Sequence, residues 1–239
     1  MEISFVITIA FLAAFIQGLT GFGSALLGMP LLLFQLDIKT AIPLMSLMGL
    51  VMNNVLFIKL RSYFKYQRLI PLLISSIAGI PIGILGLKNL PENWLKLILA
   101  AIILSYALYS LINPVQPIQP HPKFAWLAGF ISGCLGGAFN ISGPPVVLWG
   151  TMQNWPKQEF RSTLQSYFAL NGMVIAIAYA VSGLTTAIVV QYFLFSIPAI
   201  LVGIAVGNYY SEKLSQARFK QLVLVMLIAL ALMMLFSIK

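Results

Sequence analysis

Uncharged polar side chains, glycines and prolines are what this sequence offers for chemistry inside its long apolar runs. They gather in "QGLTGFGSALLGMP" (17–30) and "GCLGGAFNISGPP" (133–145), and on the apolar runs that follow. A helix interrupted at such residues presents free backbone amides and the positive end of its dipole, which favour an anion without a buried Lys or Arg. The predicted substrate-binding residues are Gln17, Thr20, Gly21, Gly23, Ser24, Gly28, Pro30, Asn53, Gly136, Asn140, Ser142, Gly143, Pro144, Pro145 and Asn171.

Catalytic groups are poorly represented in the same runs. The sole histidine, His121, lies between prolines, and the sole cysteine, Cys134, is best interpreted as a small packed residue. No carboxylate pair, metal-ligand cluster or nucleophile–base pair falls within an apolar run, so we expect neither an enzyme nor a bound metal or cofactor. The five acids all lie at run ends or in connections: Glu2, Asp37, Glu92, Glu159 and Glu212.

The composition is that of a membrane protein. Apolar residues make up 60% of the chain, charged residues 8%, and the mean hydropathy is +0.98. A soluble domain of this length needs more polar surface. The net charge of +9 comes from Lys and Arg in short connections, as orientation signals do, so we expect a lipid bilayer and no nucleic acid as partner. The first residues, "MEISFVITIA", lack the basic start of a signal peptide, and we expect them to be retained.

Apolar segments divide the chain into two halves. They fall at about 3–34, 41–60, 68–88, 94–112, 124–154, 161–182, 187–209 and 217–237. The proline-rich stretch 113–123 cannot be helical and separates them. We therefore expect one membrane domain with a first repeat at 1–112, a linker at 113–123 and a second repeat at 124–239.

The two halves resemble each other in sequence. At a shift of 115 residues, Gly18, Gly21 and Gly28 fall on glycines of the second half, and Pro30 falls on Pro145. Asn53 corresponds to Asn171, and the pair Gly79 and Gly83 corresponds to Gly203 and Gly207, at slightly larger shifts. Several matches in the same order predict an internal duplication.

Basic residues orient the two halves. Connection 59–68 carries four Lys and Arg and no acid, which predicts a cytoplasmic position, whereas its counterpart 182–187 is uncharged and is expected outside. Equivalent connections on opposite faces indicate inverted repeats. Segments 3–34 and 124–154 then each start and end on one face.

A segment that returns to its starting face is expected to be a re-entrant hairpin, with its turn buried in protein or facing a cavity. Gly21 and Gly23, or Gly136 and Gly137, are predicted to supply the positive φ angles of the turns. A single kinked spanning helix is the alternative. The predicted fold is therefore all-α, with two inverted repeats, each a Gly/Pro-broken re-entrant hairpin or kinked helix plus three transmembrane helices.

Other polar and small residues have competing interpretations. The Gly79/Gly83 and Gly203/Gly207 pairs are predicted mainly to be helix-packing faces. Asn54 and Gln165 are expected to hydrogen-bond between helices, while Asn53 and Asn171 fit that role and a substrate role equally. Arg161 is an orientation signal or, more specifically, a gating or anion-attracting residue.

The paired motifs "QGLTGFGSALLGMP" and "GCLGGAFNISGPP", the linker between them and the spacing of the apolar runs resemble the sulfite exporter TauE/SafE family over essentially the whole chain. The resemblance implies a bacterial inner-membrane, multi-pass protein that moves small sulfur-containing anions such as sulfite or organosulfonates, usually outward. It implies a site role for the motif positions given above.

The predicted function is therefore a secondary transporter, an exporter of such anions by alternating access around a midplane site, with one repeat-derived bundle moving against the other. The alternatives are an anion channel, an uptake carrier for another small organic anion, and a non-transporting membrane scaffold. The sequence leaves a proton, sodium and no ion at all as alternatives for the coupling ion, and a monomer and a homo-oligomer as alternatives for the assembly.

Overall fold

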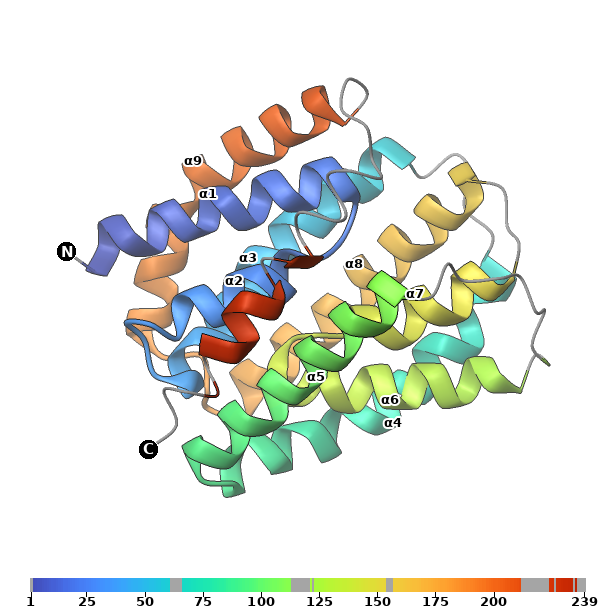
Figure 1. Ribbon diagram of the computed structural model, residues 1–239, viewed down its shortest axis with the longest axis horizontal. Coiled ribbons are helices and arrows are strands. Elements are labelled where there is room, and N and C mark those ends of the chain that lie inside the picture. Colours follow the sequence, from blue (N-terminus) through green and yellow to red (C-terminus); the bar gives the residue numbers. More distant parts are fainter. Residues whose placement is uncertain are drawn as a thin grey trace.

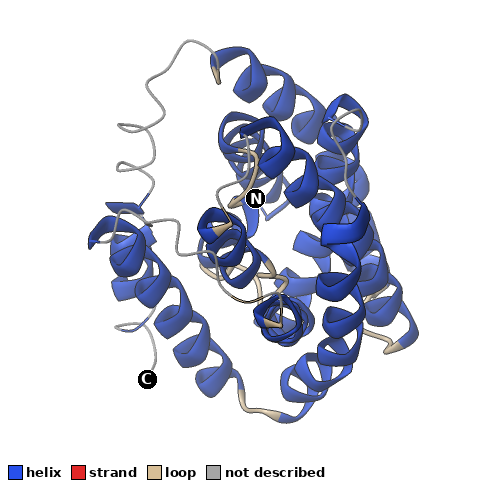
Figure 2. Cartoon of the chain, turned by 90° about the vertical axis from the view of Figure 1, so that its right-hand side faces the viewer, coloured by secondary structure: helices blue, strands red, loops and turns tan. Residues whose placement is uncertain are grey.

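Every regular element that the structure describes is a helix (Figure 1, Figure 2). The computed structural model describes residues 2–60, 66–112, 121, 123–153, 157–211, 224–225, 227–233 and 235. Most of the linker 113–123 and much of segment 217–237 lie outside this part of the chain, as does the side chain of Arg161. The helices are α1 (Glu2–Thr20), α2 (Ser24–Leu32), α3 (Ile38–Leu60), α4 (Tyr66–Asn89), α5 (Glu92–Ile112), α6 (Phe124–Phe139), α7 (Gly143–Met152), α8 (Lys157–Val181) and α9 (Ala187–Tyr210).

Six of these helices are long and apolar enough to cross a bilayer, namely α1, α3, α4, α5, α8 and α9. A spanning helix needs about 20 mainly apolar residues, because the hydrocarbon core is about 30 Å thick and a helix rises about 1.5 Å per residue. The expectation of an all-helical chain with several membrane spans is confirmed.

The first predicted hairpin segment is interrupted at residues 21–23. Gly21 and Gly23 have φ angles of 85° and 93°, which end α1 and let α2 start in a new direction. The amide of Ser24 donates to Oε1 of Gln17 (3.2 Å), and Gly28 lies against Ala13, so α2 folds back along α1. The predicted turn role of Gly21 and Gly23 is confirmed.

The second interruption does not lie where the sequence predicted it. Gly136 and Gly137 are helical residues of α6, and the positive φ angle, 56°, belongs to Asn140. Asn tolerates this conformation better than most residues, and the Asn140 amide closes the helix by donating to the carbonyl of Gly136 (2.9 Å). The expectation for Gly136 and Gly137 is therefore wrong. A glycine is needed at 137 because the carbonyl oxygen of Ile80 lies where a Cβ would be.

Each interrupted segment consists of two unequal helices. α1 has 19 residues and α2 has 9, while α6 has 16 and α7 has 10. A helix of about ten residues reaches only about 15 Å, half of the hydrocarbon core. Each segment is thus divided into two helices, and the re-entrant insertion of α2 and α7 into a bilayer stays a prediction.

Glycines join the helices into two closely packed parallel pairs. A Cβ at Gly79 or Gly83 of α4 would overlap the α6 carbonyl oxygens of Phe130 and Cys134. A Cβ at Gly203 or Gly207 of α9 would likewise overlap α1 carbonyl oxygens. Small residues permit this backbone contact between membrane helices, so the interpretation of both glycine pairs as packing faces is confirmed.

The two glycine seams, α4–α6 and α1–α9, match each other contact by contact. Gly79 meets the carbonyl of Phe130 as Gly203 meets that of Phe11. Gly137 meets the carbonyl of Ile80 as Gly18 meets that of Ile204. Gly18 therefore corresponds to Gly137, a shift of 119 residues, and not to Gly133 as the motif alignment predicted. Glycines recur at about every helical turn in both motifs, so a register error of one turn still aligns glycine with glycine.

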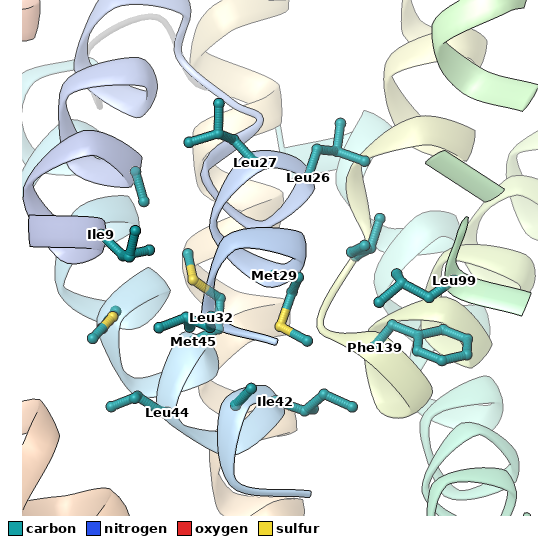
Figure 3. Close-up of a cluster of buried hydrophobic side chains, with 14 of the residues drawn as sticks. Ile9, Leu26, Leu27, Met29, Leu32, Ile42, Leu44, Met45, Leu99 and Phe139 are labelled. Atoms are coloured by element: carbon teal, nitrogen blue, oxygen red, sulfur yellow. The ribbon is translucent and has the colours of Figure 1, made fainter. Parts of the chain in front are cut away.

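The two seams form opposite edges of the bundle, with α3 and α8 packed between them (Figure 1). Each seam contains one helix from each half of the sequence, so the halves interlock. The short helix α2 is embedded in the apolar core (Figure 3). Its Leu26, Leu27, Met29 and Leu32 lie among Ile9 of α1, Ile42, Leu44 and Met45 of α3, Leu99 of α5 and Phe139 of α6.

The α4–α6 seam gives a stability prediction. We expect Gly83→Val to destabilise the protein by about 1–3 kcal/mol, because its side chain would overlap the backbone at Cys134. Gly86→Val on the same helix is the matched control, since the nearest atom to a Cβ there is Leu90 Cδ1 at 4.0 Å. Thermal unfolding in detergent measures both variants. Equal melting temperatures for the two variants would contradict the close contact.

Candidate functional site

The two helix breaks meet at one small cavity in the centre of the bundle. Its volume is about 60 Å³, room for a few water molecules or a compact polar group. The first turns of α2 and α7 contribute to its wall, together with side chains of α1, α3 and α8. The cavity brings together these predicted site residues: Gln17, Gly23, Ser24, Asn53, Asn140, Ser142, Gly143, Pro144 and Asn171.

Gln17 holds the start of α2. Its Oε1 accepts from the Ser24 amide (3.2 Å), and its Nε2 donates to Oδ1 of Asn53 (2.6 Å). Gln17 is 2% exposed, so both bonds form away from solvent. The first backbone hydrogen bond of α2 runs from the Leu27 amide to the Gly23 carbonyl (3.2 Å). The amides of Ala25 and Leu26 come before it and therefore have no carbonyl partner within the helix. They are helix-start donors in the cavity wall, where they favour negative charge.

A second network holds the start of α7. Asn171 Nδ2 donates to Oγ of Ser142 (3.2 Å), and Asn171 Oδ1 accepts from Oγ of Ser76 (2.7 Å). The Ser142 carbonyl accepts from Oγ of Ser132 (2.5 Å), which also contacts the hydroxyl of Tyr167 (2.7 Å). Pro144 and Pro145 remove two amide donors from this turn, so α2 is the richer source of amides.

Several donors in the cavity wall are left without a partner among the described residues. These are the hydroxyls of Ser24 and Ser46 and the side-chain amide of Asn140. None of the lining residues is Lys, Arg, His, Asp or Glu. Neutral donors and helix-start amides around an unoccupied polar space can bind a small anion, whereas the described wall offers no group for acid–base chemistry.

The remaining predicted residues lie outside the cavity wall. The hydroxyl of Thr20 donates to the carbonyls of Ile16 (2.8 Å) and Phe22 (2.5 Å) and so ends α1. The backbone carbonyl of Gly21 accepts a hydrogen bond from Nε2 of Gln165. Gly136 lies directly against the side chain of Ser142. Gly28 and Pro30 are buried in α2, with Gly28 packed on Met45. Pro145 faces a different cavity.

That second cavity is larger, about 800 Å³, and mainly apolar. It lies beside the ends of α1 and α9, the start of α8, and along α5, α6 and α7. Phe22 and Pro144 line both cavities and therefore separate them. Arg161, the predicted anion-attracting residue, belongs to the first turns of α8, but its side chain lies outside the described part of the structure.

Sequence reasoning missed part of the cavity wall. Ser46 and Gly49 share one face of α3 with Asn53, a spacing of three and seven residues that would have predicted them. On α8, Phe168 and Gly172 were missed. Gln165 was expected to hydrogen-bond between helices, and this is confirmed because it donates from α8 to the carbonyl of Gly21. The same expectation for Asn54 is wrong, because Asn54 donates to the carbonyl of Leu50 in its own helix (2.8 Å).

Asn140 has two separable roles, one in the backbone and one in the side chain. We expect Asn140→Gly to keep the stability of the protein, since glycine adopts positive φ freely, but to weaken anion binding by removing the unpaired amide. Asn140→Ala should weaken binding equally and also destabilise the protein by about 1 kcal/mol. Thermal unfolding with and without sulfite measures both effects. Unchanged binding in Asn140→Gly would remove the amide from the site.

The comparisons with known proteins agree with a membrane carrier. The family described as "Sulfite exporter TauE/SafE" matches residues 6–234. A relative named "Probable sulfite/organosulfonate exporter TauE", from Cupriavidus necator, is 22% identical over 222 residues, which cover 90% of this chain and 87% of the relative. No solved structure matches the chain. Because the family match extends over nearly the whole sequence, this multi-pass membrane protein belongs to the sulfite exporter TauE/SafE family of transporters.

Proposed function

We propose that the chain is a secondary transporter that exports small sulfur-containing anions, sulfite or organosulfonates, across the bacterial inner membrane. The observation that carries the proposal is the central cavity, where two interrupted helices begin among unpaired neutral donors. Such a site lowers the cost of a buried anion without a fixed cation that would hold the anion too tightly to release. The name of the Cupriavidus necator relative supports the substrate class and the outward direction.

We infer that the two halves are inverted repeats and that α2 and α7 are re-entrant. Three observations support this. In Figure 1, each helix of the first half runs opposite to its counterpart in the second half: α1 opposite to α6, α3 opposite to α8, and α4 opposite to α9. The α1–α9 and α4–α6 seams repeat the same backbone contacts. The most basic connection and its uncharged counterpart then face opposite sides of the membrane.

We infer that the moving bodies are not the two halves of the sequence. Each glycine seam joins one helix of each half through backbone contact, so moving one half against the other would break both seams. We propose instead that the α1–α9 and α4–α6 pairs move as units about α3 and α8, alternately opening the central cavity to either side.

The larger cavity is the proposed route between the site and the cytoplasm. It lies at the end of the bundle where α8 begins and α9 ends. In the sequence, the basic stretches 155–161 and 212–220 adjoin these two helix ends. Basic connections mark the cytoplasmic face, and they raise the local concentration of anions. Phe22 and Pro144, which border both cavities, stand where a gate is needed.

A flux assay tests the proposed function. Purified protein in proteoliposomes should give saturable sulfite or methanesulfonate flux, and Gly49→Ile should reduce it at least about tenfold, since a branched side chain there fills the cavity beside Asn140 and Asn53. Gly86→Ile, outside the cavity, is the control. Non-saturable flux would favour a channel, and absence of flux for every sulfur anion tested would contradict the proposal.

Surface labelling tests the inverted arrangement. In a Cys134→Ala background, a thiol introduced by Thr186→Cys, at the exposed start of α9, should react with an impermeant maleimide only from outside the cell. Lys123→Cys, at the start of α6, should react only from the cytoplasm. Neither native side chain caps its helix, so both substitutions should be tolerated. Labelling of both sites from the same side would contradict inverted repeats.

A further inference from the structure

Ser46 is a buried serine that lacks the hydrogen bond usual for serines within helices. It lies on α3 in the wall of the central cavity, is 2% exposed, and its Oγ has no hydrogen-bond partner among the described residues. Serines in helices usually donate to the carbonyl four residues earlier, as Ser166 and Ser196 do here (2.8 and 2.7 Å). A buried hydroxyl without this bond has no hydrogen-bond partner in the part of the protein that the structure describes. A ligand in the cavity would supply one.

Among the residues that the structure describes, the cavity wall also holds no charged group that would balance a second negative charge. No titratable residue with a described side chain on the helices around it belongs to the wall itself. Two buried tyrosines on α8 are engaged elsewhere: Tyr167 contacts Ser132, and Tyr179 donates to the carbonyl of Gly136. The full set on these helices is Glu2, Lys39, Lys59, Cys134, Lys157, Glu159, Arg161, Tyr167 and Tyr179.

Charge squared governs the cost of burying an ion. The Born penalty of a dianion is about four times that of a monoanion of the same size, and neutral donors do not offset the difference as a buried Lys or Arg would. Each helix start, with all its free amides together, supplies only about half an elementary charge. A cavity of about 60 Å³ with this wall therefore favours one negative charge.

We propose that the central cavity binds its substrate as a monoanion, with the Ser46 hydroxyl as a direct ligand. The proposal rests on the proposed function and specifies the protonation state of its substrate. Bisulfite and organosulfonates without a second acidic group satisfy it, whereas fully ionised sulfite and sulfate do not. A hydroxyl both donates and accepts, so Ser46 also suits an oxyanion that still carries a proton.

The pH dependence of flux tests the charge of the substrate. Sulfite flux at constant total concentration should fall about tenfold per pH unit above the second ionisation of sulfite, as the monoanion disappears. Methanesulfonate, a monoanion throughout, should show constant flux, and sulfate should not compete. Protein-free liposomes correct for leakage. Sulfite flux that holds steady or rises with pH overturns the proposal, as does an equal fall for methanesulfonate, because the titrating group would then be on the protein.

Substitution of Ser46 tests its role as a ligand. Ser46→Ala should weaken competition by methanesulfonate about tenfold or more, the loss expected for a hydrogen bond to a charged group. Ser196→Ala is the matched control, a buried serine on α9 that already has a partner. Equal affinities of Ser46→Ala and the unaltered protein overturn the role of Ser46. Flux of neither anion by the unaltered protein would instead contradict the proposed function, which separates the two failures.

Discussion

Backbone polar groups that are exposed at a helix break must find partners, and in an apolar bundle water does not supply them. This requirement shapes the centre of the protein. Gln17 satisfies the amide that begins α2, Gln165 satisfies the carbonyl of Gly21, and Ser132 satisfies the carbonyl of Ser142. The polar side chains of the core thus have a structural explanation first. In the cavity wall, the donors of Ser24, Ser46 and Asn140 that take no part in this satisfaction are the ones available to a ligand.

The same side chains connect the cavity to the glycine seams. Ser76 lies on α4 and bonds Asn171, while Ser132 lies on α6 and holds the start of α7. Gln17 lies on α1, within the other seam, and bonds Asn53 of α3. A displacement of either seam relative to α3 and α8 therefore alters hydrogen bonds in the cavity wall. This coupling would give the proposed alternating access a physical basis, since an anion that completes the donors in one arrangement would bias the bundle toward that arrangement.

A neutral wall also fits the task of a transporter. A fixed cation would strengthen anion binding and slow its release, whereas amides and hydroxyls provide several moderate interactions that can be exchanged for water. Membership of the sulfite exporter TauE/SafE family agrees with such a site. The larger apolar cavity beside Phe22 adds space without adding charge among its described lining residues, so the proposed selection by charge belongs to the central cavity.

Composition and local pattern determined the class of the protein. The apolar runs required membrane helices, the Gly/Pro motifs required interruptions, and the absence of acids and bases from the runs left neutral groups as the candidate site. These properties are local along the chain, so sequence reasoning reached them, including Asn53 and Asn171 in one cavity. Tertiary structure decided the register. With glycine at successive turns, local sequence cannot distinguish a helix break at Gly136 from one at Asn140. In the structure Gly137 packs against Ile80 as a helical residue, and the positive φ angle of the break lies at Asn140. It also decided the role of Ser46, because a missing hydrogen-bond partner is a property of neighbours from distant parts of the chain.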